Sequence, residues 1–418
     1  MKKSRLLTVL LATMLLAATA LNLSGCLMSV SAEDLMNGIS PNNPPMIEDM
    51  RDGNIALSDF GLRLLRACEN SDKNTLISPL SVILALSMTA NGADGQTKAQ
   101  MEQVLGMSIE DLNSYLYSYS ASLPQGEKYK LAIADSIWIK DDSRLKVFEA
   151  FLQSNANYYS ADVYKVPFNK KTLFDINSWV KEKTDNMIPG VLNDIPDEAL
   201  IYIINALAFE AEWSSLYKKA QVRDDIFTTE DGKEQQVELM FSTEHRYLED
   251  SLAKGFIKYY KAGKYAFAAL LPNEGVSMRD YIASLDGEKL ASLLGNATGA
   301  EVICALPKFE CEYSIEMSDI LSGMGMSDAF SPKNADFSSL GSYDDGNIFI
   351  SNIIHKTYIE VGERGTRAGA VTAIAMDGAA AGPEEEPKKV YLNRPFVYML
   401  IDCENNVPFF IGTVMGID

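Results

Sequence analysis

Side chains that could catalyse a reaction are scarce in this chain. Only two histidines occur, His245 and His355, and no nucleophile elbow of the G-x-S-x-G kind accompanies either of them. His355 lies in an apolar stretch, where a hydrogen-bonded core histidine is more common than a catalytic base. His245 lies in a polar stretch and is expected at the surface. Zinc spacings, Walker loops and calcium loops are absent from the sequence. We therefore expect no enzyme, no cofactor and no metal.

A long segment near the C-terminus is the most informative part of the sequence. Residues 363–387 join two strand-like stretches, 355–360 and 389–392, without a clear element of their own. Connections of this length are uncommon in compact domains and are usually functional or disordered. In an extended chain, one face of the first half is uncharged, and it consists of Thr366, Ala368, Ala370, Thr372, Ile374 and Met376. The pattern favours a loop that becomes a buried strand, although a flexible Ala/Gly linker is the alternative.

The composition excludes some partners. The 418 residues have a net charge of −20, which argues against nucleic acid or another polyanion. No internal repeat and no linker divides the body of the chain. We expect one unit that mixes helices and sheets, and a monomer.

The N-terminus resembles a targeting segment. Lys2, Lys3 and Arg5 precede an apolar run over residues 6–23. The run ends in residues 23–26 (LSGC), which resemble the bacterial lipobox, in which the cysteine, here Cys26, receives the lipid. An uncleaved membrane anchor is the alternative. Both interpretations predict a body outside the cytoplasm, anchored at the cell surface.

The segment after Cys26 is rich in proline and asparagine. The sequence thus predicts a signal peptide over 1–25, a lipid-anchored flexible tether over 26–46 and a folded domain over 47–418. Four further cysteines show no C-x-x-C spacing: Cys68, Cys304, Cys311 and Cys403. A disulfide is compatible with this compartment, but buried free thiols are expected.

Periodicity predicts several elements of the body. A helix begins at about Asn54, and a second begins at Pro79 after the capping residue Ser78. A helix over 174–188 and strands over 131–139 and 199–209 follow. Three strands close the chain, at 355–360, 396–401 and 409–414.

Motifs spread along the body resemble those of the serpin family. They are residues 74–81 (NTLISPLS) with Met88, 91–93 (NGA), Gly95, Thr97 and Gln100; Asn205 and Ala206 with Phe209 and Trp213; 306–309 (LPKF); 323–326 (GMGM); Ala329 and Phe330; 335–338 (ADFS); His355 and Lys356; 363–366 (ERGT); 393–396 (NRPF); and 408–412 (PFFIG). Each is weak alone, but their number, order and spacing over residues 47–418 are specific.

The resemblance implies an α+β serpin fold with three β-sheets, eight to nine helices and an exposed reactive-centre loop at about 363–390. A serine protease takes this loop as a substrate and becomes trapped as an acyl complex when the cleaved loop inserts into the large sheet. The hinge would be Glu363, Gly365, Thr366, Ala368, Gly369 and Ala370. Ser78, Ser81, Asn205 and His355 match a polar cluster beneath the sheet, and Trp213 matches the aromatic residue where insertion starts.

Two departures from the family pattern affect the site. Serpin hinges usually have acidic residues where this chain has Arg364 and Arg367. Arg367 should face outward after insertion and be tolerated. Counting along the loop as in most serpins places the scissile bond at Ala379–Ala380. Because the loop is longer than usual, Ala381 and Met376 are alternative sites.

Alanine at the cut predicts an elastase-like or subtilisin-like target, and the sequence is identified as a lipid-anchored bacterial inhibitor. A serpin that is only cleaved, or that only binds a partner, is the alternative. A surface enzyme is a third possibility, but the sequence offers no catalytic pair for it.

Overall fold

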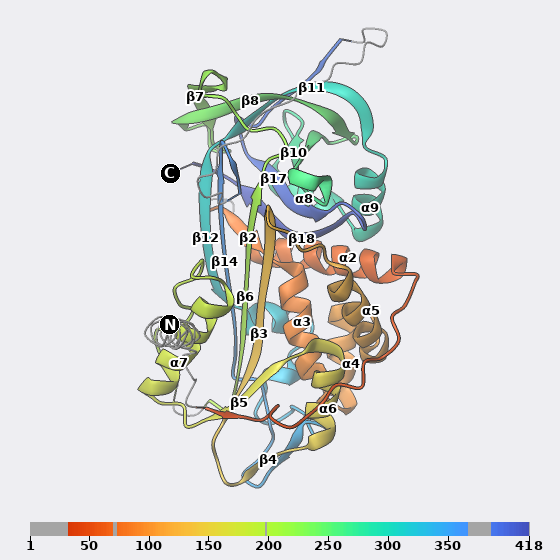
Figure 1. Cartoon of the computed structure of the whole chain (residues 1–418), viewed down its shortest axis with the longest axis vertical. Coiled ribbons are helices and arrows are strands. Elements are labelled where there is room, and N and C mark those ends of the chain that lie inside the picture. Colours follow the sequence, from red (N-terminus) through yellow and green to blue (C-terminus); the bar gives the residue numbers. More distant parts are fainter. Residues whose placement is uncertain (1–31, 70–72, 197–198, 367–385, 418) are drawn as a thin grey trace, which may run out of the picture. The chain divides into compact units, whose positions relative to one another are not determined.

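The computed structural model describes residues 32–69, 73–196, 199–366 and 386–417, and these residues form nine α-helices and three β-sheets (Figure 1). From Glu33 onward they belong to one compact unit. The α+β architecture expected from the sequence is confirmed.

A seven-stranded sheet runs through the centre of this unit. Its strands in order are β1 (Glu33–Asp34), β5 (Asp162–Val166), β3 (Tyr129–Lys140), β6 (Ile201–Glu212), β15 (Gly365–Thr366), β14 (Asn352–Gly362) and β12 (Phe309–Glu316). β6 is an unbroken apolar run except for Asn205 and two glutamates, as expected for a strand buried on both faces. β14 pairs directly with β6 in parallel, and β15 lies between the two strands at one end.

A nine-stranded sheet packs beyond the end where β15 lies (Figure 1). Its path is β16 (Lys388–Tyr391), β11 (Thr298–Pro307), β8 (Glu234–Glu249), β9 (Ala253–Tyr259), β10 (Tyr265–Pro272), β17 (Phe396–Asp402), β18 (Val407–Val414) and β2 (Thr75–Ile77), with β7 (Val222–Thr228) paired to β8. A third sheet consists of β4 (Leu145–Val147) and β13 (Gly341–Tyr343). Thus β15 and β16, the strands on either side of residues 367–387, belong to different sheets.

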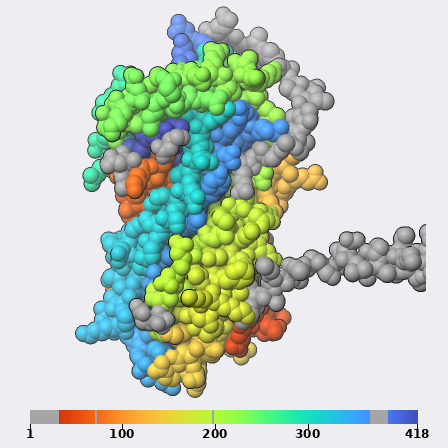
Figure 2. Space-filling view, turned by 90° about the vertical axis from the view of Figure 1, so that its left-hand side faces the viewer, coloured from red at the N-terminus to blue at the C-terminus, as the bar shows by residue number. Residues whose placement is uncertain are grey.

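The helices cover the sheets. They are α2 (Arg51–Cys68), α3 (Pro79–Ala90), α4 (Gly95–Leu105), α5 (Ile109–Ser122), α6 (Glu149–Tyr159), α7 (Lys170–Lys183), α8 (Met278–Ser284), α9 (Gly287–Gly295) and α10 (Ser318–Met324), with short 3₁₀ turns η1 (Lys219–Gln221), η2 (Lys261–Gly263) and η3 (Asp328–Phe330). α3 is buried along its whole length and contacts β3, β6 and β18. α7 lies on the opposite face of the seven-stranded sheet (Figure 1). In Figure 2, α7 (yellow-green) covers the lower part of this face, and β12 (cyan) reaches the surface beside it.

Local chemistry explains where the helices begin and end. Ser78 caps α3 as predicted, because its hydroxyl accepts a hydrogen bond from the Ser81 amide, and Pro79 is the first helical residue. The helix expected over 174–188 instead begins at Lys170, after the capping residue Asn169. It ends at Lys183 because Asp185 and Asn186 adopt left-handed backbone conformations.

The segment before residue 47 differs from the sequence prediction. β1 pairs with β5, and the Leu35 amide donates to the Val163 carbonyl oxygen. The apolar side chains of Leu35, Met36 and Ile39 pack against the core. The expectation of a flexible tether is therefore wrong from Glu33 onward, because these apolar side chains and an open strand edge hold the chain in place.

The leader and Cys26 lie outside the described residues. Within the part of the chain that the structure describes, no helix is both long enough and apolar enough to span a membrane.

Candidate functional site

The two central strands of the seven-stranded sheet separate at one end. Direct pairing of β6 with β14 ends at Ala208 and Tyr358. Beyond this point β15 is wedged between them, with Thr366 opposite both Val361 and Ala211. We call this region the fork; it comprises residues 209–212, 359–362 and β15. The sequence predicted a loop exposed from residue 363, but its first two residues after the turn are already part of the sheet.

Gly365 and Thr366 fit the fork for different reasons. Gly365 has a φ of 153°, and a Cβ there would lie 1.9 Å from the Ala211 carbonyl oxygen. Only glycine therefore fits at this position. Thr366 is fully buried, and its hydroxyl is 2.5 Å from the Tyr260 hydroxyl. The buried Thr366 hydroxyl thus has a hydrogen-bond partner in Tyr260.

Trp213 anchors the turn between β14 and β15. Its ring stacks on Tyr260, with 4.4 Å between centroids and 7° between planes. The indole Nε1–H donates to the Gly362 carbonyl oxygen at 2.8 Å, and the Trp213 amide donates to the Arg364 carbonyl oxygen at 2.9 Å. The structure therefore places this residue where the hinge enters the sheet.

Glu363 lies in the same turn and has two contacts of its own. Its carbonyl oxygen accepts from the Tyr217 amide at 3.1 Å, and its carboxylate is 2.5 Å from the Lys308 ammonium. Lys308 also pairs with Glu238 at 3.0 Å. Burial alone would raise the pKa of Glu363. The hydrogen bond and charge of Lys308, together with a backbone hydrogen bond, outweigh this effect, so the pKa of Glu363 is lowered. The turn thus carries an ionised carboxylate held by a lysine.

A buried lysine that the sequence analysis missed supports these aromatic residues. Lys258 is 1% exposed, and its ammonium is 2.6 Å from the Glu244 carboxylate. The ammonium also lies over the rings of Tyr217, at 4.5 Å, and Trp213, at 5.4 Å. A lysine in the otherwise largely apolar strand β9 was the available signal. Cation–π contacts of this kind are stronger when desolvated.

Three polar residues form one row across the sheet. His355 on β14 is in register with Asn205 on β6, and Asn205 is in register with Asp135 on β3. The His355 Nδ1 is 2.5 Å from the Asn205 Oδ1, and the Asn205 amide nitrogen donates to an Asp135 carboxylate oxygen at 2.6 Å. A strand inserted between β6 and β14 must break the contact between His355 and Asn205.

The row joins the start of α3. The Ser78 backbone amide donates to the His355 Nε2 at 3.1 Å, so the other ring nitrogen, Nδ1, donates to Asn205. The Ser81 hydroxyl approaches Asp135 at 3.4 Å. The structure thus brings together all four residues that the family resemblance assigned to a polar cluster, and adds Asp135. As the one charge on the inward face of the 131–139 strand, Asp135 was detectable from sequence.

Burial controls the charges in this row. It lowers the pKa of His355 to about 3, so the ring is neutral at neutral pH. It also raises the pKa of Asp135 well above its usual range, against the opposing hydrogen bonds from Asn205 and Ser81. Since Nε2 of His355 accepts from a backbone amide and Nδ1 faces an amide oxygen, this histidine activates no hydroxyl nucleophile.

Other parts of the described chain offer no catalytic alternative. His245 is exposed on β8, as expected. Cys68, Cys304 and Cys311 are buried free thiols, and Cys403 is a half-buried one. No group of three metal-ligating side chains occurs among the described residues.

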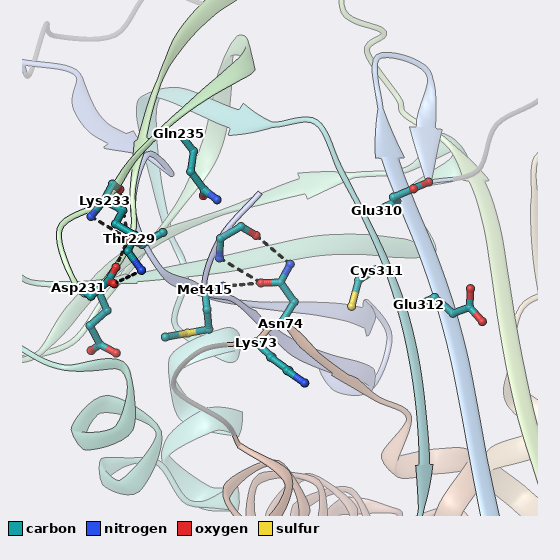
Figure 3. Close-up of a pocket in the computed structure, with 12 residues that line it drawn as sticks. Lys73, Asn74, Thr229, Asp231, Lys233, Gln235, Glu310, Cys311, Glu312 and Met415 are labelled. Carbon is teal, nitrogen blue, oxygen red and sulfur yellow. Dashed lines mark hydrogen bonds and ion pairs between the residues drawn. The ribbon is translucent and has the colours of Figure 1, made fainter. Parts of the chain in front are cut away.

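A polar pocket of about 850 Å³ lies at the edge of β12 (Figure 3). The Asn74 side chain there accepts from the Met415 amide at 2.7 Å and donates to the Gly416 carbonyl oxygen at 2.9 Å. Asn74 is thus occupied in tying β2 to the C-terminal strand, and the pocket contains none of the predicted site residues.

Several predicted site residues cannot be placed. The hinge residues Ala368, Gly369 and Ala370 and the candidate cleavage residues Met376, Ala379, Ala380 and Ala381 lie outside the described residues. The described hinge therefore ends at Thr366.

Comparison with known proteins agrees with this geometry. The sequence model of the family described as "Serpin (serine protease inhibitor)" matches residues 55–417. The chain is a member of the serpin family. Serpins are protease inhibitors and not catalytic enzymes, which accords with the absence of catalytic motifs from the sequence.

Curated and solved relatives span nearly the same length. This serpin is similar to an uncharacterized serpin-like protein of Thermococcus kodakarensis, with 28% identity over 86% of this chain and 85% of the relative. Plasminogen activator inhibitor 1 of Sus scrofa is 27% identical over 86% and 91% of the two chains. The crystal structure of the thermophilic serpin tengpin in the native state has 47% identity and a TM-score of 0.87, covering 92% of this chain and 100% of tengpin. For tengpin in the latent state, the TM-score is 0.79.

Proposed function

We propose that this serpin is a suicide-substrate inhibitor of serine proteases of the elastase or subtilisin type. The observation that carries the proposal is the fork. β6 and β14 pair directly from Ala208 and Tyr358 inward, while Gly365 and Thr366 of the loop already lie between these strands at the other end. A cleaved loop that continued this wedge would gain hydrogen bonds to two strands and bury its uncharged face.

Continuing the register of β15 gives each loop residue a partner. Thr372 would lie opposite both His355 and Asn205, the pair whose contact insertion breaks. Its hydroxyl can donate and accept one hydrogen bond each, and so replace what these two side chains lose. The polar row is thus suited to both the closed and the filled sheet.

The covalent step uses the scissile peptide bond of this chain and needs none of its side chains as a catalyst. The protease serine Oγ attacks the carbonyl carbon of the scissile residue, Ala379 in our proposal, and the C–N bond to Ala380 breaks. The serine proton passes through the protease histidine to the departing amine, which becomes a new N-terminus. Insertion of the cleaved loop then carries the ester-linked protease away and distorts its active site before water can hydrolyse the ester.

The target class follows from the small side chains at the proposed cut. Residues 378–382 read GAAAG and include neither arginine nor lysine. They suit proteases whose primary specificity pocket is small. Met376, Ala380 and Ala381 remain alternative residues for cleavage.

We also propose that the chain is a lipoprotein held at the cell surface through Cys26. The LSGC sequence at residues 23–26 after an apolar run supports this. A Cys26→Ala chain expressed in a bacterium should lose incorporation of labelled palmitate and leave the membrane fraction. Equal labelling of both chains would refute the anchor.

Thr366→Arg tests the inhibitory mechanism. The arginine would have to enter a site where the native side chain is fully buried, and burying a charge there is costly. We expect the variant to be cleaved by elastase or subtilisin without forming the covalent complex that the wild type forms. Thr229→Arg, at a half-buried threonine after β7, is the control. If the wild type is only cleaved, the non-inhibitory alternative replaces this proposal.

A further inference from the structure

The fork has two acidic residues at its inner end. β15 occupies the positions opposite Val361 and Ala211, and the direct pairing of β6 with β14 begins only at Ala208 and Tyr358. Glu210 on β6 and Glu360 on β14 therefore lie between the wedge and the closed part of the sheet. Val361 and Ala211 are buried, whereas Glu360 is exposed and Glu210 half-buried, so both glutamates lie on the outward face.

The surroundings of these glutamates are also acidic. Glu360 is directly opposite Glu310 on β12. The Tyr358 hydroxyl is 3.3 Å from the Glu310 carboxylate and 3.4 Å from that of Glu360. The pKa of Tyr358 is raised to about 12, mainly because the side chain is partly buried and next because these two carboxylates lie close to it. Like charges directly opposite each other on adjacent strands are destabilising.

On the other side of the fork, Glu210 is in register with Lys130 on β3. Lys130 itself forms an ion pair with Asp185. The cation next to Glu210 is therefore shared with another carboxylate. Farther out on β6, Glu212 is paired with Lys128 and Lys261, so the acidic side chains gather at the inner end of the fork, at Glu210, Glu310 and Glu360.

The register of β15 predicts which loop residue would reach this face. Thr366 pairs with Val361 and with Ala211, so the next residue of an antiparallel strand pairs with residue 360 on one side and residue 210 on the other. That residue is Arg367. Because strand side chains alternate, Arg367 would point to the same outward face as Glu210 and Glu360.

We propose that Glu210 and Glu360 form an acceptor site for Arg367, filled when the cleaved loop inserts. This inference rests on the proposed function, since it concerns the first step of insertion beyond Thr366. A guanidinium has donors on several sides and can pair with carboxylates on both flanking strands. An acidic residue at 367, which most serpin hinges have, would instead face two carboxylates with a third behind Glu360. The arginine therefore assists insertion in this chain rather than being merely tolerated.

The site acts early in insertion. Arg367 is the first loop residue that must enter after those already in the sheet, so its contacts form before most of the ladder. Partly exposed ion pairs have small energies. Replacing the attraction of Arg367 to two carboxylates by repulsion corresponds to about a 3- to 10-fold change in the insertion rate. Such a change shifts the competition between trapping the protease and hydrolysis of the acyl ester.

The experiment is a charge-swap cycle in the full serpin. The variants are Arg367→Glu, Glu360→Lys and the double variant, with Glu210→Gln to test the other flank. Lys333→Glu, at an exposed lysine after η3, is the control for net charge. The measured quantities are moles of serpin consumed per mole of protease trapped, and the rate at which protease activity is lost.

We expect Arg367→Glu to raise the consumed amount severalfold, and the double variant to return it to within about twofold of the wild-type value. Glu210→Gln should raise it less, and Lys333→Glu should leave it unchanged. The effect of Arg367→Glu should shrink in 1 M NaCl, because salt screens exposed charges. Equal values for wild type and Arg367→Glu, or no rescue in the double variant, would overturn the proposal.

A second measurement separates this proposal from the proposed function. The loop is cleaved, and the thermal midpoint of each cleaved variant is compared with that of its native form. If the wild type neither traps a protease nor gains stability on cleavage, the proposed function is wrong. If the wild type does both and Arg367→Glu matches it in both, only the acceptor site is wrong.

Discussion

Replacing Lys258 by methionine tests the role of the buried charge behind the hinge. Methionine has a similar length and no charge, so the change removes the ammonium and preserves most of the packing. It leaves the Glu244 carboxylate, whose side chain is 13% exposed, without its lysine partner at 2.6 Å. Tyr217 and Trp213 also lose the cation over their rings, and both residues hold the turn of the hinge.

The expected loss can be worked from the contacts. Removing one partner of a buried ion pair costs about 3–5 kcal/mol, because an uncompensated charge remains. Glu244 keeps the hydrogen bond from the Ser242 hydroxyl at 2.8 Å, which favours the lower end of that range. We therefore predict that Lys258→Met lowers the free energy of unfolding by about 3 kcal/mol.

The assay is urea-induced unfolding followed by tryptophan fluorescence, carried through a double-mutant cycle. Adding Glu244→Gln to Lys258→Met removes the orphaned charge and should recover about 2–3 kcal/mol of the loss. The control is Lys233→Met, which breaks the pair of Lys233 with Asp231, where the side chains are 79% and 56% exposed. That control should cost far less than Lys258→Met, because ion pairs exposed to solvent contribute little.

Two results would show that Lys258 does not stabilise the hinge region through its buried pair. If Lys258→Met costs no more than Lys233→Met, the buried pair has no larger role than an exposed one. If Glu244→Gln adds a loss to that of Lys258→Met and recovers nothing, the two residues do not act as a pair.

Three further predictions follow from the same structure. Gly365→Ala should expel β15 and alter Trp213 fluorescence, because its Cβ would clash with the Ala211 carbonyl oxygen, whereas Gly362→Ala, whose Cβ meets no atom within 4 Å, should not; identical spectra would contradict the fork. The pKa of His355 is about 3, below the ~6.5 of an exposed histidine, so the unfolded chain takes up the proton first and the free energy of unfolding should fall as pH decreases from about 6.5 toward about 3. His355→Gln should reduce that slope in urea unfolding across this pH range, and an unchanged slope would show that another group causes it. A chain beginning at residue 47 should unfold about 2–4 kcal/mol more easily than one beginning at Glu33, since it lacks β1 and three partly buried apolar side chains; equal midpoints would restore the flexible tether.

Local sequence signals predicted much of the fold. The cap at Ser78 and the proline after it located α3 to the residue, because these features act within one helical turn. The apolar runs located β3 and β6 to within a few residues. The helix α7 was misplaced because its capping box at Asn169 and the left-handed residues that end it were overlooked.

Contacts between distant residues were beyond the sequence. The pairing of Lys258 with Glu244 depends on the register of β8 and β9, which no local pattern specifies. The wedge of β15 depends on the space between two strands far apart in the chain. Likewise, the sequence shows only that Arg367 differs from the acidic residue of most serpin hinges. The register of β15 adds that an inserted residue 367 would lie beside Glu210 and Glu360.

A trapping reaction with pancreatic elastase and with subtilisin shows directly whether this serpin inhibits by inserting its cleaved loop. The chain from Glu33 onward is mixed with each enzyme, and the products are run on a denaturing gel and analysed by mass spectrometry. We expect a denaturation-resistant band at the summed mass of serpin and protease, and a released peptide that begins at Ala380. Cleavage within the loop by both enzymes without such a band would contradict inhibition by loop insertion.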